Sequence, residues 1–482
     1  MTSGAAGAQG LARLPLIAAW VAAQMGGAIT AGDAAREFGR VSIDTRTLQA
    51  GDLYFGIRGE RFDGAQFTGP AIDAGAAGVV VPRGWSATAT GSAKALAECA
   101  VVIEVDDTTV ALQDLAHAIR RESGTKVVAI TGSAGKTTTK EVTSEFLEAR
   151  YRVVRNHGNF NNHIGLPLSL IELRQRPEMA VVELGMNHAG EISTLVRVAE
   201  PDVRVWTNVG EAHLGFFASL DAIADAKAEI LEGATSSAVL VANADDPRIA
   251  ARIGAFAGRV VTFGIDAGAA DVRASAVMDR GIDGTSARVT TRHGAVELTT
   301  PLIGLANLAN ILAATAVAEE FGVPLDSVAA RAAHLQPAAH RGEVVRLASG
   351  LTIVDDSYNA NPTATRKALD VLAASPAARR IAVIGEMLEL GDRSAELHRG
   401  VGRAAQARVD LLFAVGGAPA KALADAAVAA GMPAASVRYF ATSDEAADAA
   451  VALVRRGDLV LVKGSRGVKT DRVVDRLKAE RG

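Results

Sequence analysis

The segment from Lys126 to Ala149 constrains the fold of this chain more than any other part of the sequence. An apolar run, Val127–Ile130, leads through a glycine-containing loop into a helix expected to begin near Lys136. In such a strand–loop–helix arrangement, backbone N–H groups and the helix dipole face one point, where the Lys136 side chain adds positive charge. The pattern therefore predicts a phosphate-binding loop that comprises Thr131, Gly132, Ser133, Ala134, Gly135, Lys136, Thr137 and Thr138.

This loop differs from the common G-x-x-x-x-G-K-[ST] pattern. Ile130 stands where the first glycine would be, and Gly132 follows two residues later. A chance Gly-Lys-Thr sequence in a surface turn is the alternative, but the strand, the loop and the helix all fall where the motif requires them. We therefore expect ATP as the ligand, with the Thr137 hydroxyl able to bind a magnesium ion.

The length and the pattern of apolar runs predict three α/β domains. A chain of 482 residues is too long for one ordinary hydrophobic core. Short apolar runs with glycine-rich turns predict a small α/β domain over residues 1–120, and strands alternating with helices predict a mononucleotide-binding domain over 121–336. The latter includes an expected hairpin-bearing excursion at Asp266–Thr300. Beyond the Pro-containing linker Gln336–His340, the alternation over 337–482 predicts a doubly wound, Rossmann-like sheet.

Composition excludes some partners and compartments. Lys plus Arg number 50 and Asp plus Glu number 54, which gives a net charge of −4 and argues against nucleic acid as a partner. The single cysteine, Cys99, cannot form an internal disulfide, so a reducing, cytoplasmic setting is expected. The uncharged stretch Leu14–Gly32 resembles a signal peptide, but its strongly apolar part is shorter than the ~20 residues of a membrane span. We expect an amphipathic first helix there and no membrane insertion.

Two strand ends and one helix supply candidate metal ligands. Glu183 lies at the end of the buried-type strand Ala180–Leu184, and His213 lies in the loop after the strand Val203–Thr207. The carboxyl ends of parallel strands meet at one sheet edge, so both side chains can face the phosphate loop. A solvated surface glutamate and a structural histidine are the alternatives. Lys227 lies in a helical segment among acidic neighbours, and by composition alone it is a surface lysine.

Two further segments are rich in hydrogen-bonding side chains. Asn156–Pro167 contains four asparagines, which favour contact with sugar, phosphate or peptide groups of a substrate; a surface turn is the alternative. Val354–Pro362 leads from a strand through a polar turn into a helix near Thr363. A helix-capping turn explains part of this segment. The adjacent Asp355 and Asp356 also suit a nucleotide cleft between domains.

These elements, in this order, resemble the Mur ligase family over nearly the whole chain. The resemblance also rests on the N-terminal segments Ser42–Arg46, Gly51–Phe55 and Gly59–Gly64. It implies an ATP-dependent amide ligase of cell-wall synthesis, in which the N-terminal domain binds the uridine diphosphate end of a precursor. The amino-acid sequence of Asp356–Pro362 is similar to that of the family members that join D-alanyl-D-alanine to UDP-N-acetylmuramoyl-tripeptide.

The resemblance implies roles for individual residues. Glu183, His213 and a carbamylated Lys227 become magnesium ligands beside Thr137, and the catalytic set comprises Lys136, Glu183, His213, Lys227 and Arg341. Further contacts with ATP are expected at Asn307, Asn310, Arg341 and Asp356. Substrate contacts are expected at Ser42, Asp44, Arg46, Gly59, Asp63, Asn159, Asn161, Asn162, Ser357, Asn359, Asn361, Lys463, Ser465 and Arg466.

The chain departs from the family pattern in details that leave its charged groups in place. Ala306 replaces a frequent histidine before Asn307, Glu386 replaces an aspartate, and Arg341 lies in the context His340-Arg341-Gly342.

The implied mechanism activates a carboxylate as an acyl phosphate, which an amine then attacks. A related ligase, of the diamino-acid-adding or folylpolyglutamate type, is the alternative enzyme, and a phosphate-loop switch without ligase activity is the alternative of another class. A monomer is expected.

Overall fold

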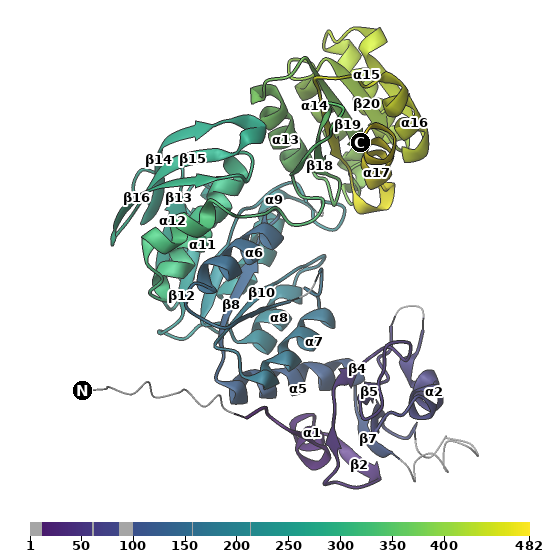
Figure 1. Ribbon diagram of the computed structural model, residues 1–482. Helices are drawn as coiled ribbons and strands as arrows, with labels where there is room; N and C mark the ends of the chain where they lie inside the picture. The colour runs from purple at the N-terminus through teal and green to yellow at the C-terminus, as the bar shows by residue number, and fades with distance from the viewer. Residues whose placement is uncertain (1–11, 60–61, 86–99, 157, 213) are drawn as a thin grey trace. The chain divides into compact units, whose positions relative to one another are not determined.

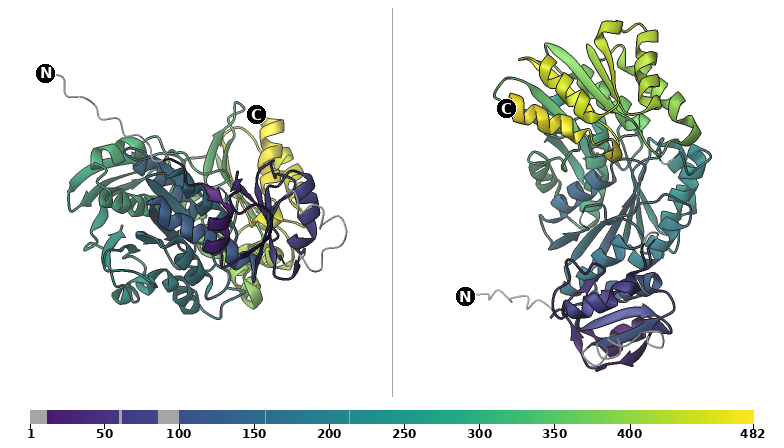
Figure 2. Two further views of the ribbon diagram at one scale, coloured as in Figure 1. Left: turned by 90° about the horizontal axis from the view of Figure 1, so that it is seen from below. Right: turned by 90° about the vertical axis from the view of Figure 1, so that its right-hand side faces the viewer.

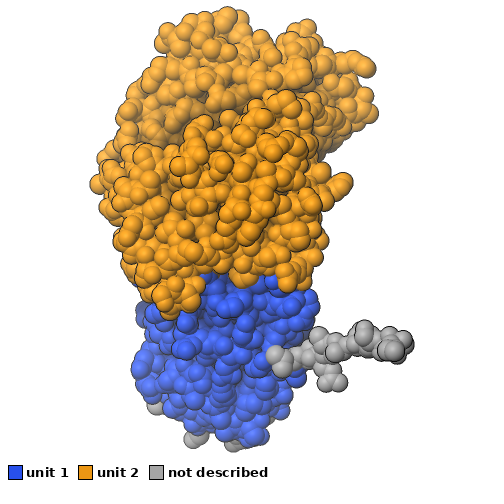
Figure 3. All heavy atoms as spheres, turned by 90° about the vertical axis from the view of Figure 1, so that its left-hand side faces the viewer, with its two compact units in different colours: residues 1–129, 151–186, 191–202 blue, residues 130–150, 187–190, 203–482 orange. Residues whose placement is uncertain are grey.

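The computed structural model describes residues 12–59, 62–85, 100–156, 158–212 and 214–482. The chain divides into two compact units (Figure 3). The first unit comprises residues 1–129, 151–186 and 191–202, and the second comprises 130–150, 187–190 and 203–482. Both units contain helices and β-sheets, so the predicted α/β class is confirmed. His213 and Cys99 lie outside the described residues.

A five-stranded sheet forms the core of the N-terminal part of the first unit. Across the sheet its strands are β2 (Ala28–Ala31), β7 (Val101–Val105), β6 (Gly78–Pro82), β5 (Leu53–Phe55) and β4 (Val41–Ser42). All neighbours are parallel except β2 and β7. The small buried residues of β6 and β7 pack with Tyr54 and with Ile72 of helix α2 (Thr68–Asp73). The predicted small α/β arrangement is therefore present.

The uncharged stretch near the N-terminus forms a helix that is shorter than expected. Helix α1 (Ala18–Gln24) buries Ala18, Val21 and Ala22. The chain then turns at Gly26, whose φ is 61°, and continues into strand β2. No helix in the described ranges is long and apolar enough to cross a membrane.

The first unit also contains the asparagine-rich segment and the strand that precedes Glu183. Strands β9 (Val153–Arg155) and β10 (Met179–Glu183) pair in parallel. Every residue of β10 is buried, as its apolar run predicted. Helices α5 (Thr108–Ser123), α7 (Gly165–Ile171) and α8 (Glu191–Ala199) complete this part of the unit.

The second unit begins with the end of strand β8 (Lys126–Thr131), the phosphate loop and helix α6 (Lys136–Leu147). Strands β11 (Val203–Trp206), β12 (Val239–Asn243) and β13 (Arg259–Gly264) are parallel neighbours. The predicted hairpin-bearing excursion is also present. It forms the antiparallel run β14 (Val272–Asp279), β15 (Thr285–Thr291) and β16 (Gly294–Thr300).

The C-terminal part of the second unit contains a six-stranded sheet. Across the sheet its strands are β17 (Glu343–Arg346), β18 (Thr352–Asp356), β22 (Asp458–Lys463), β19 (Arg379–Gly385), β20 (Leu411–Val415) and β21 (Val437–Phe440). The last five strands are parallel, and β17 is antiparallel to β18. Strand β22 lies between β18 and β19, so the strand order reverses there. Ligands of doubly wound sheets bind at the carboxyl ends of strands at such a reversal.

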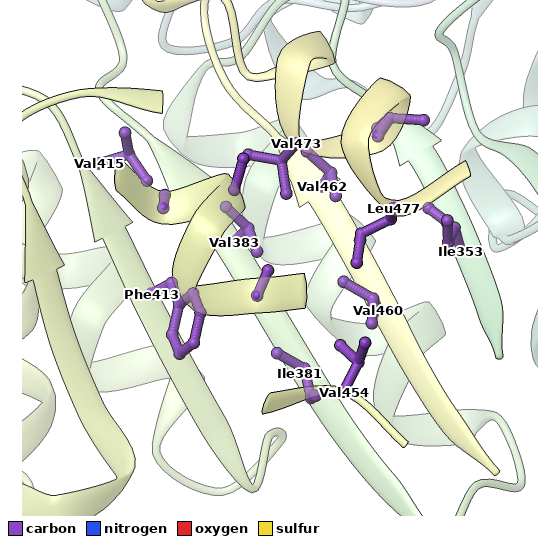
Figure 4. Packing of buried hydrophobic residues seen from close by; sticks show 14 of the residues in the cluster. Ile353, Ile381, Val383, Phe413, Val415, Val454, Val460, Val462, Val473 and Leu477 are labelled. Atoms are coloured by element: carbon purple, nitrogen blue, oxygen red, sulfur yellow. The ribbon is translucent and has the colours of Figure 1, made fainter. Parts of the chain in front are cut away.

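Helices cover both faces of this sheet, which confirms the predicted doubly wound fold. Helices α16 (Ser443–Leu453) and α17 (Asp471–Arg481) lie on one face (Figures 1 and 2). Their apolar residues pack on apolar side chains of the central strands, including Val383, Phe413 and Val460 (Figure 4). Helices α13 (Pro362–Ala374), α14 (Ser394–Ala405) and α15 (Ala418–Ala429) lie on the other face.

One buried histidine links helix α14 to the loop after β19. The His398 Nε2 atom accepts the Met387 N–H at 2.9 Å, and its Nδ1 lies 2.7 Å from the Ser394 carbonyl oxygen. These partners require a neutral ring with its proton on Nδ1. Burial lowers the pKa of His398, although Ser394 and the charge of Glu386 oppose this change.

We expect the pH dependence of stability to report this histidine. The unfolded chain binds a proton on His398 below about pH 6.5, whereas the folded chain resists it, so stability falls as the pH falls through that value and the contribution is fully present above it. In His398→Gln the amide oxygen can accept the Met387 N–H but does not titrate. Thermal unfolding between about pH 7.5 and about pH 5.5 should therefore change less for the variant than for the wild type. Equal pH dependences would contradict the assigned role.

Candidate active site

The phosphate loop contains two glycines that no other residue can replace without a shift of the structure. Gly132 and Gly135 have φ angles of 154° and 80°. A Cβ atom at Gly132 would lie 1.9 Å from the Thr207 hydroxyl oxygen, and one at Gly135 would lie 2.4 Å from the Asn310 side-chain oxygen. Helix α6 begins immediately after Gly135, which as a glycine has no side chain to cap the first turn. Its N–H groups and the Lys136 ammonium group therefore suit a phosphate ligand.

The loop after β11 braces the phosphate loop. The Asn208 side chain accepts the Ala134 N–H and donates to the Ala134 carbonyl, both at 2.9 Å. The Ser133 N–H donates to the Asn208 carbonyl at 3.0 Å, and the Gly210 N–H donates to the Ser133 hydroxyl at 2.9 Å. Sequence reasoning missed this role of Asn208. The only feature of the sequence that could have indicated this role is an amide side chain, able to donate and accept hydrogen bonds, shortly after a strand.

The predicted asparagine pair lies at the start of helix α11 (Leu305–Glu320). Asn310 is buried against Gly135 and donates to the Asn307 side-chain oxygen at 3.2 Å. Asn307 donates to the Ile303 carbonyl at 2.9 Å. The structure thus brings Asn310 to the phosphate loop, with Asn307 beside it and Ala306 exposed.

Glu183 is held by the asparagine-rich segment. Its carboxylate accepts the Asn161 side-chain N–H at 2.7 Å, and its own N–H donates to the Asn156 side-chain oxygen at 3.1 Å. Glu183 is buried, so the alternative of a solvated surface glutamate is wrong. The other two asparagines predicted to contact a substrate lie in different surroundings. Asn162 caps helix α7 by accepting the Gly165 N–H at 2.8 Å, and Asn159 is exposed.

Lys227 lies on helix α9 (Leu220–Ala228) and is only 1% exposed, so the surface lysine suggested by composition is wrong. Its acidic neighbours Asp221 and Asp225 point outward and pair with Arg252. The buried Arg204 fixes the end of this segment by donating to the Ile230 carbonyl at 2.6 Å. Burial lowers the pKa of Arg204 to about 10.

The magnesium site formed by the four predicted ligands stays a prediction. Thr137 and Lys227 lie in the second unit, Glu183 lies in the first, and His213 is outside the described residues. Within the described ranges, no three His, Cys, Asp or Glu side chains gather in a way that could hold a metal ion.

The carboxyl ends of β18 and β22 bring a second group of predicted residues together. Asp356 and Lys463 are register partners, and their side chains form an ion pair at 2.7 Å. The Lys463 ammonium group also donates to the Asn359 carbonyl at 3.0 Å. Burial raises the pKa of Asp356, while Lys463 and Arg341 oppose this change. The adjacent Asp355 is completely buried and accepts the Ser357 hydroxyl at 2.6 Å.

Arg341 is held over the ring of Tyr358. The guanidinium carbon lies 3.9 Å from the ring centre, and the Arg466 guanidinium lies 6.0 Å from the same centre. The preceding residue, His340, has a φ of 60°. Its Nδ1 atom lies 2.8 Å from a carboxylate oxygen of Asp355, and its backbone carbonyl accepts the Tyr358 N–H at 3.1 Å. The end of the predicted linker is therefore fixed to the turn after β18.

Other predicted residues of the C-terminal part have structural partners. Asn361 caps helix α13 by accepting the Ala364 N–H at 2.8 Å. The Ser465 hydroxyl accepts the Leu388 N–H at 2.9 Å. Glu386, which stands where the family has an aspartate, accepts the Gly417 N–H at 2.7 Å. The longer side chain thus reaches the start of helix α15.

The N-terminal candidates gather near the end of β5. Arg46 binds Asp44 at 2.6 Å and lowers the pKa of that carboxyl to about 2. Asp63 accepts the Ala65 N–H at 3.0 Å, and the charges of Asp44 and Asp63 add to burial in raising the pKa of Tyr54 to about 12. The remaining two predicted residues, Ser42 and Gly59, make local contacts with Asp44 and Phe62.

Comparison with known families gives matches to three successive segments. Residues 37–120 match the model described as Mur ligase family, catalytic domain. Residues 130–318 match the Mur ligase middle domain, and residues 340–466 match the Mur ligase, glutamate ligase domain.

Individual relatives match nearly end to end. The UDP-N-acetylmuramoyl-tripeptide–D-alanyl-D-alanine ligase of Bacillus subtilis is 35% identical over 90% of this chain and 92% of its own. The ligase of the same name from Mycobacterium tuberculosis is 35% identical over 97% of this chain and 98% of its own. A crystal structure of MurF from Acinetobacter baumannii has a TM-score of 0.87 and 30% identity, covering 97% of this chain and 100% of its own. The MurF ligase from Thermotoga maritima in complex with ADP has a TM-score of 0.80 and 28% identity, covering 92% and 97%.

Proposed function

Because this chain belongs to the Mur ligase family, we propose that it is an ATP-dependent ligase that adds D-alanyl-D-alanine to UDP-N-acetylmuramoyl-tripeptide in peptidoglycan synthesis. The observation that carries the proposal is the 35% identity to ligases of this name over 90% or more of the chain. Folylpolyglutamate synthase from Mycobacterium tuberculosis has a TM-score of 0.62 at 19% identity, which is a likeness of fold alone.

The phosphate loop fits ATP as the activating substrate. Amide formation from a carboxylate and an amine is uphill in water, so the tripeptide carboxylate must first gain a leaving group. Its oxygen attacks the γ-phosphorus atom, ADP leaves, and an acyl phosphate forms. Lys136 and the first N–H groups of helix α6 would hold the phosphates and offset the repulsion between the two anions.

The second step joins the two peptides. The amine of D-alanyl-D-alanine attacks the acyl carbonyl carbon, loses a proton, and inorganic phosphate leaves to give the amide. We propose that Asp356 and Arg341 contact the nucleotide and that Lys463, Ser465, Arg466, Ser357, Asn359 and Asn361 surround the incoming dipeptide. Asp356 and Lys463 lie at the strand-order reversal of the C-terminal sheet, where a ligand site is expected.

The proposed magnesium site comprises Thr137, Glu183, His213 and Lys227. Magnesium ions bound there would supply positive charge to the phosphates during the attack. Lys227 is 1% exposed, so a carboxylate group formed on its side chain would lie inside the protein. We propose that its uncharged amine adds CO2 and loses a proton to give a carbamate, whose oxygens suit magnesium. The N-terminal residues Ser42, Asp44, Arg46, Gly59 and Asp63 would hold the uridine diphosphate end, and Asn159, Asn161 and Asn162 the peptide end.

The cellular setting follows from the proposed chemistry. A reaction that consumes ATP and a uridine nucleotide is expected in the cytoplasm, and a chain with one cysteine suits that reducing compartment. The expected monomer stays a prediction.

We expect the purified protein to release phosphate only when ATP, UDP-N-acetylmuramoyl-tripeptide and D-alanyl-D-alanine are all present. Mass spectrometry of the mixture should show the pentapeptide product. Precursors with lysine or meso-diaminopimelate at the third position would be compared, and L-alanyl-L-alanine serves as the control dipeptide. Turnover with folate and glutamate instead would assign the chain to the related ligase. ATP binding without any amide product would assign it to a phosphate-loop switch.

A further inference from the structure

The loop after β11 contacts two different parts of the second unit. On one side, the Gly210 N–H donates to the Ser133 hydroxyl of the phosphate loop at 2.9 Å. On the other side, the next residue, Glu211, accepts hydrogen bonds from two residues at the start of helix α13. These are the Thr363 hydroxyl, at 3.2 Å, and the Arg366 guanidinium group.

Helix α13 begins directly after the turn that follows Asp356, the last residue of β18. The turn residue Asn361 caps this helix, and Thr363 lies in its first turn. A Cβ atom at Gly210 would lie 3.7 Å from the Thr363 hydroxyl oxygen, so the backbone of the loop approaches the helix closely. One continuous path of contacts therefore runs from the turn after Asp356 through Arg366 and Glu211 to Ser133.

The Glu211–Arg366 ion pair is partly shielded from water, so we expect it to contribute to stability. The Glu211 side chain is 19% exposed and that of Arg366 is 36% exposed, whereas fully exposed pairs contribute little because water screens them. The pair joins the segment matched by the middle-domain model to the segment matched by the C-terminal model.

We propose that Glu211 and Arg366 are positioning residues that couple docking of the C-terminal sheet to the geometry of the phosphate loop. Arg366 holds Glu211, Glu211 fixes the Asn208–Glu211 loop, and this loop holds Ser133 and Ala134 in the conformation that binds ATP. Neither residue contacts the reacting atoms in this scheme. The inference deepens the proposed function and rests on it, since it assigns the phosphate loop to ATP.

A second ion pair across the same two segments provides a matched control. Arg346 of β17 binds Asp283, in the turn between β14 and β15, at 2.6 Å. Both side chains are more than half exposed, and their ion pair is separate from the hydrogen bonds of the Asn208–Glu211 loop described above. Loss of this pair removes a docking contact but leaves the Asn208–Glu211 loop untouched.

The test compares Glu211→Gln, Arg366→Gln, the double variant and Arg346→Gln. Two quantities would be measured on the full chain: kcat/KM for ATP from phosphate release, and the Kd of ADP from calorimetry without other substrates. We expect each single variant of the Glu211 pair to lower kcat/KM and ADP affinity by about tenfold, a usual coupling energy for contacting residues. The double variant should be no worse than either single variant. Arg346→Gln should stay within about twofold of the wild type.

A charge swap separates positioning from simple damage to the loop. The double variant Glu211→Arg with Arg366→Glu restores the pair in reverse and should recover part of the lost ADP affinity. Additive losses in the Gln double variant, or an equal loss in Arg346→Gln, would overturn the inference in favour of docking alone. If the wild type made no amide product, the proposed function would fail instead. The ADP measurement would still test the positioning role of the Glu211–Arg366 pair. An unchanged ADP affinity in Arg366→Gln would reject that role.

Discussion

Lys136→Ala is expected to reduce turnover by at least about 10³-fold, because the variant removes the positive charge that offsets the approach of two anions. Lys136 lies in the first turn of α6, and its ammonium group donates to the Gly132 carbonyl at 2.9 Å. Alanine is a good helix former, so the fold should survive. Phosphate release and product mass spectrometry measure the activity, and thermal unfolding checks the fold.

Lys126→Ala is the matched control for this prediction. Lys126 is the first residue of β8, the strand that leads into the phosphate loop; it is exposed and pairs with Asp202 at 2.8 Å. Its loss should leave turnover near the wild-type rate. Lys136→Arg should remain strongly impaired, because the planar guanidinium group places its charge differently from an ammonium group. A wild-type rate in Lys136→Ala would refute the assignment of the phosphate loop.

Lys227→Ala is expected to lose activity by about 10²-fold or more and to regain part of it when a short-chain carboxylate such as acetate is added. The substitution removes the proposed carbamate, and ligands that bind magnesium contribute strongly to stabilising charge during phosphoryl transfer. Because Lys227 is buried, alanine leaves a space that a small carboxylate can enter. Turnover measured against acetate concentration tests the rescue.

Lys227→Met separates the carbamate from a purely structural lysine. Methionine fills much of the space but offers no amine, so this variant should be inactive and should not respond to acetate. In the wild type, carbon-13 NMR under labelled CO2 should detect a carbamate carbon that is missing from both variants. Full activity of Lys227→Ala without added carboxylate would rule out the proposed role.

The sequence predicted those features that depend on local pattern. The phosphate loop follows from a strand, a short loop with two glycines and a lysine directly after the second glycine, and the structure has the strand and helix where that pattern requires them. The doubly wound sheet follows from apolar runs that alternate with helices. The excursion after Gly264 was also predictable, since turn residues interrupt that alternation.

Features that depend on contacts between distant residues could not be predicted from one sequence. The hydrogen bond from the Asn161 side chain to Glu183, which lies 22 residues away, was not predicted. Composition suggested a surface Lys227, although the periodicity of α9 turns its acidic neighbours outward and the lysine inward. The brace that Asn208 forms on the phosphate loop needs the pairing of separate chain segments, which residue pattern alone does not specify.

The position of β22 has a consequence for the synthesis of this protein. It is the last strand in the sequence, yet it lies inside the C-terminal sheet, between β18 and β19, and contributes Lys463 to the ion pair with Asp356, 107 residues earlier. Neither β18 nor β19 can pair with β22 until the ribosome has translated this strand. Because such distant pairings form late, a chain released early would lack the centre of this sheet and expose two apolar strand edges. A chain that lacks β22 would therefore contain Asp356 without the lysine that forms its ion pair.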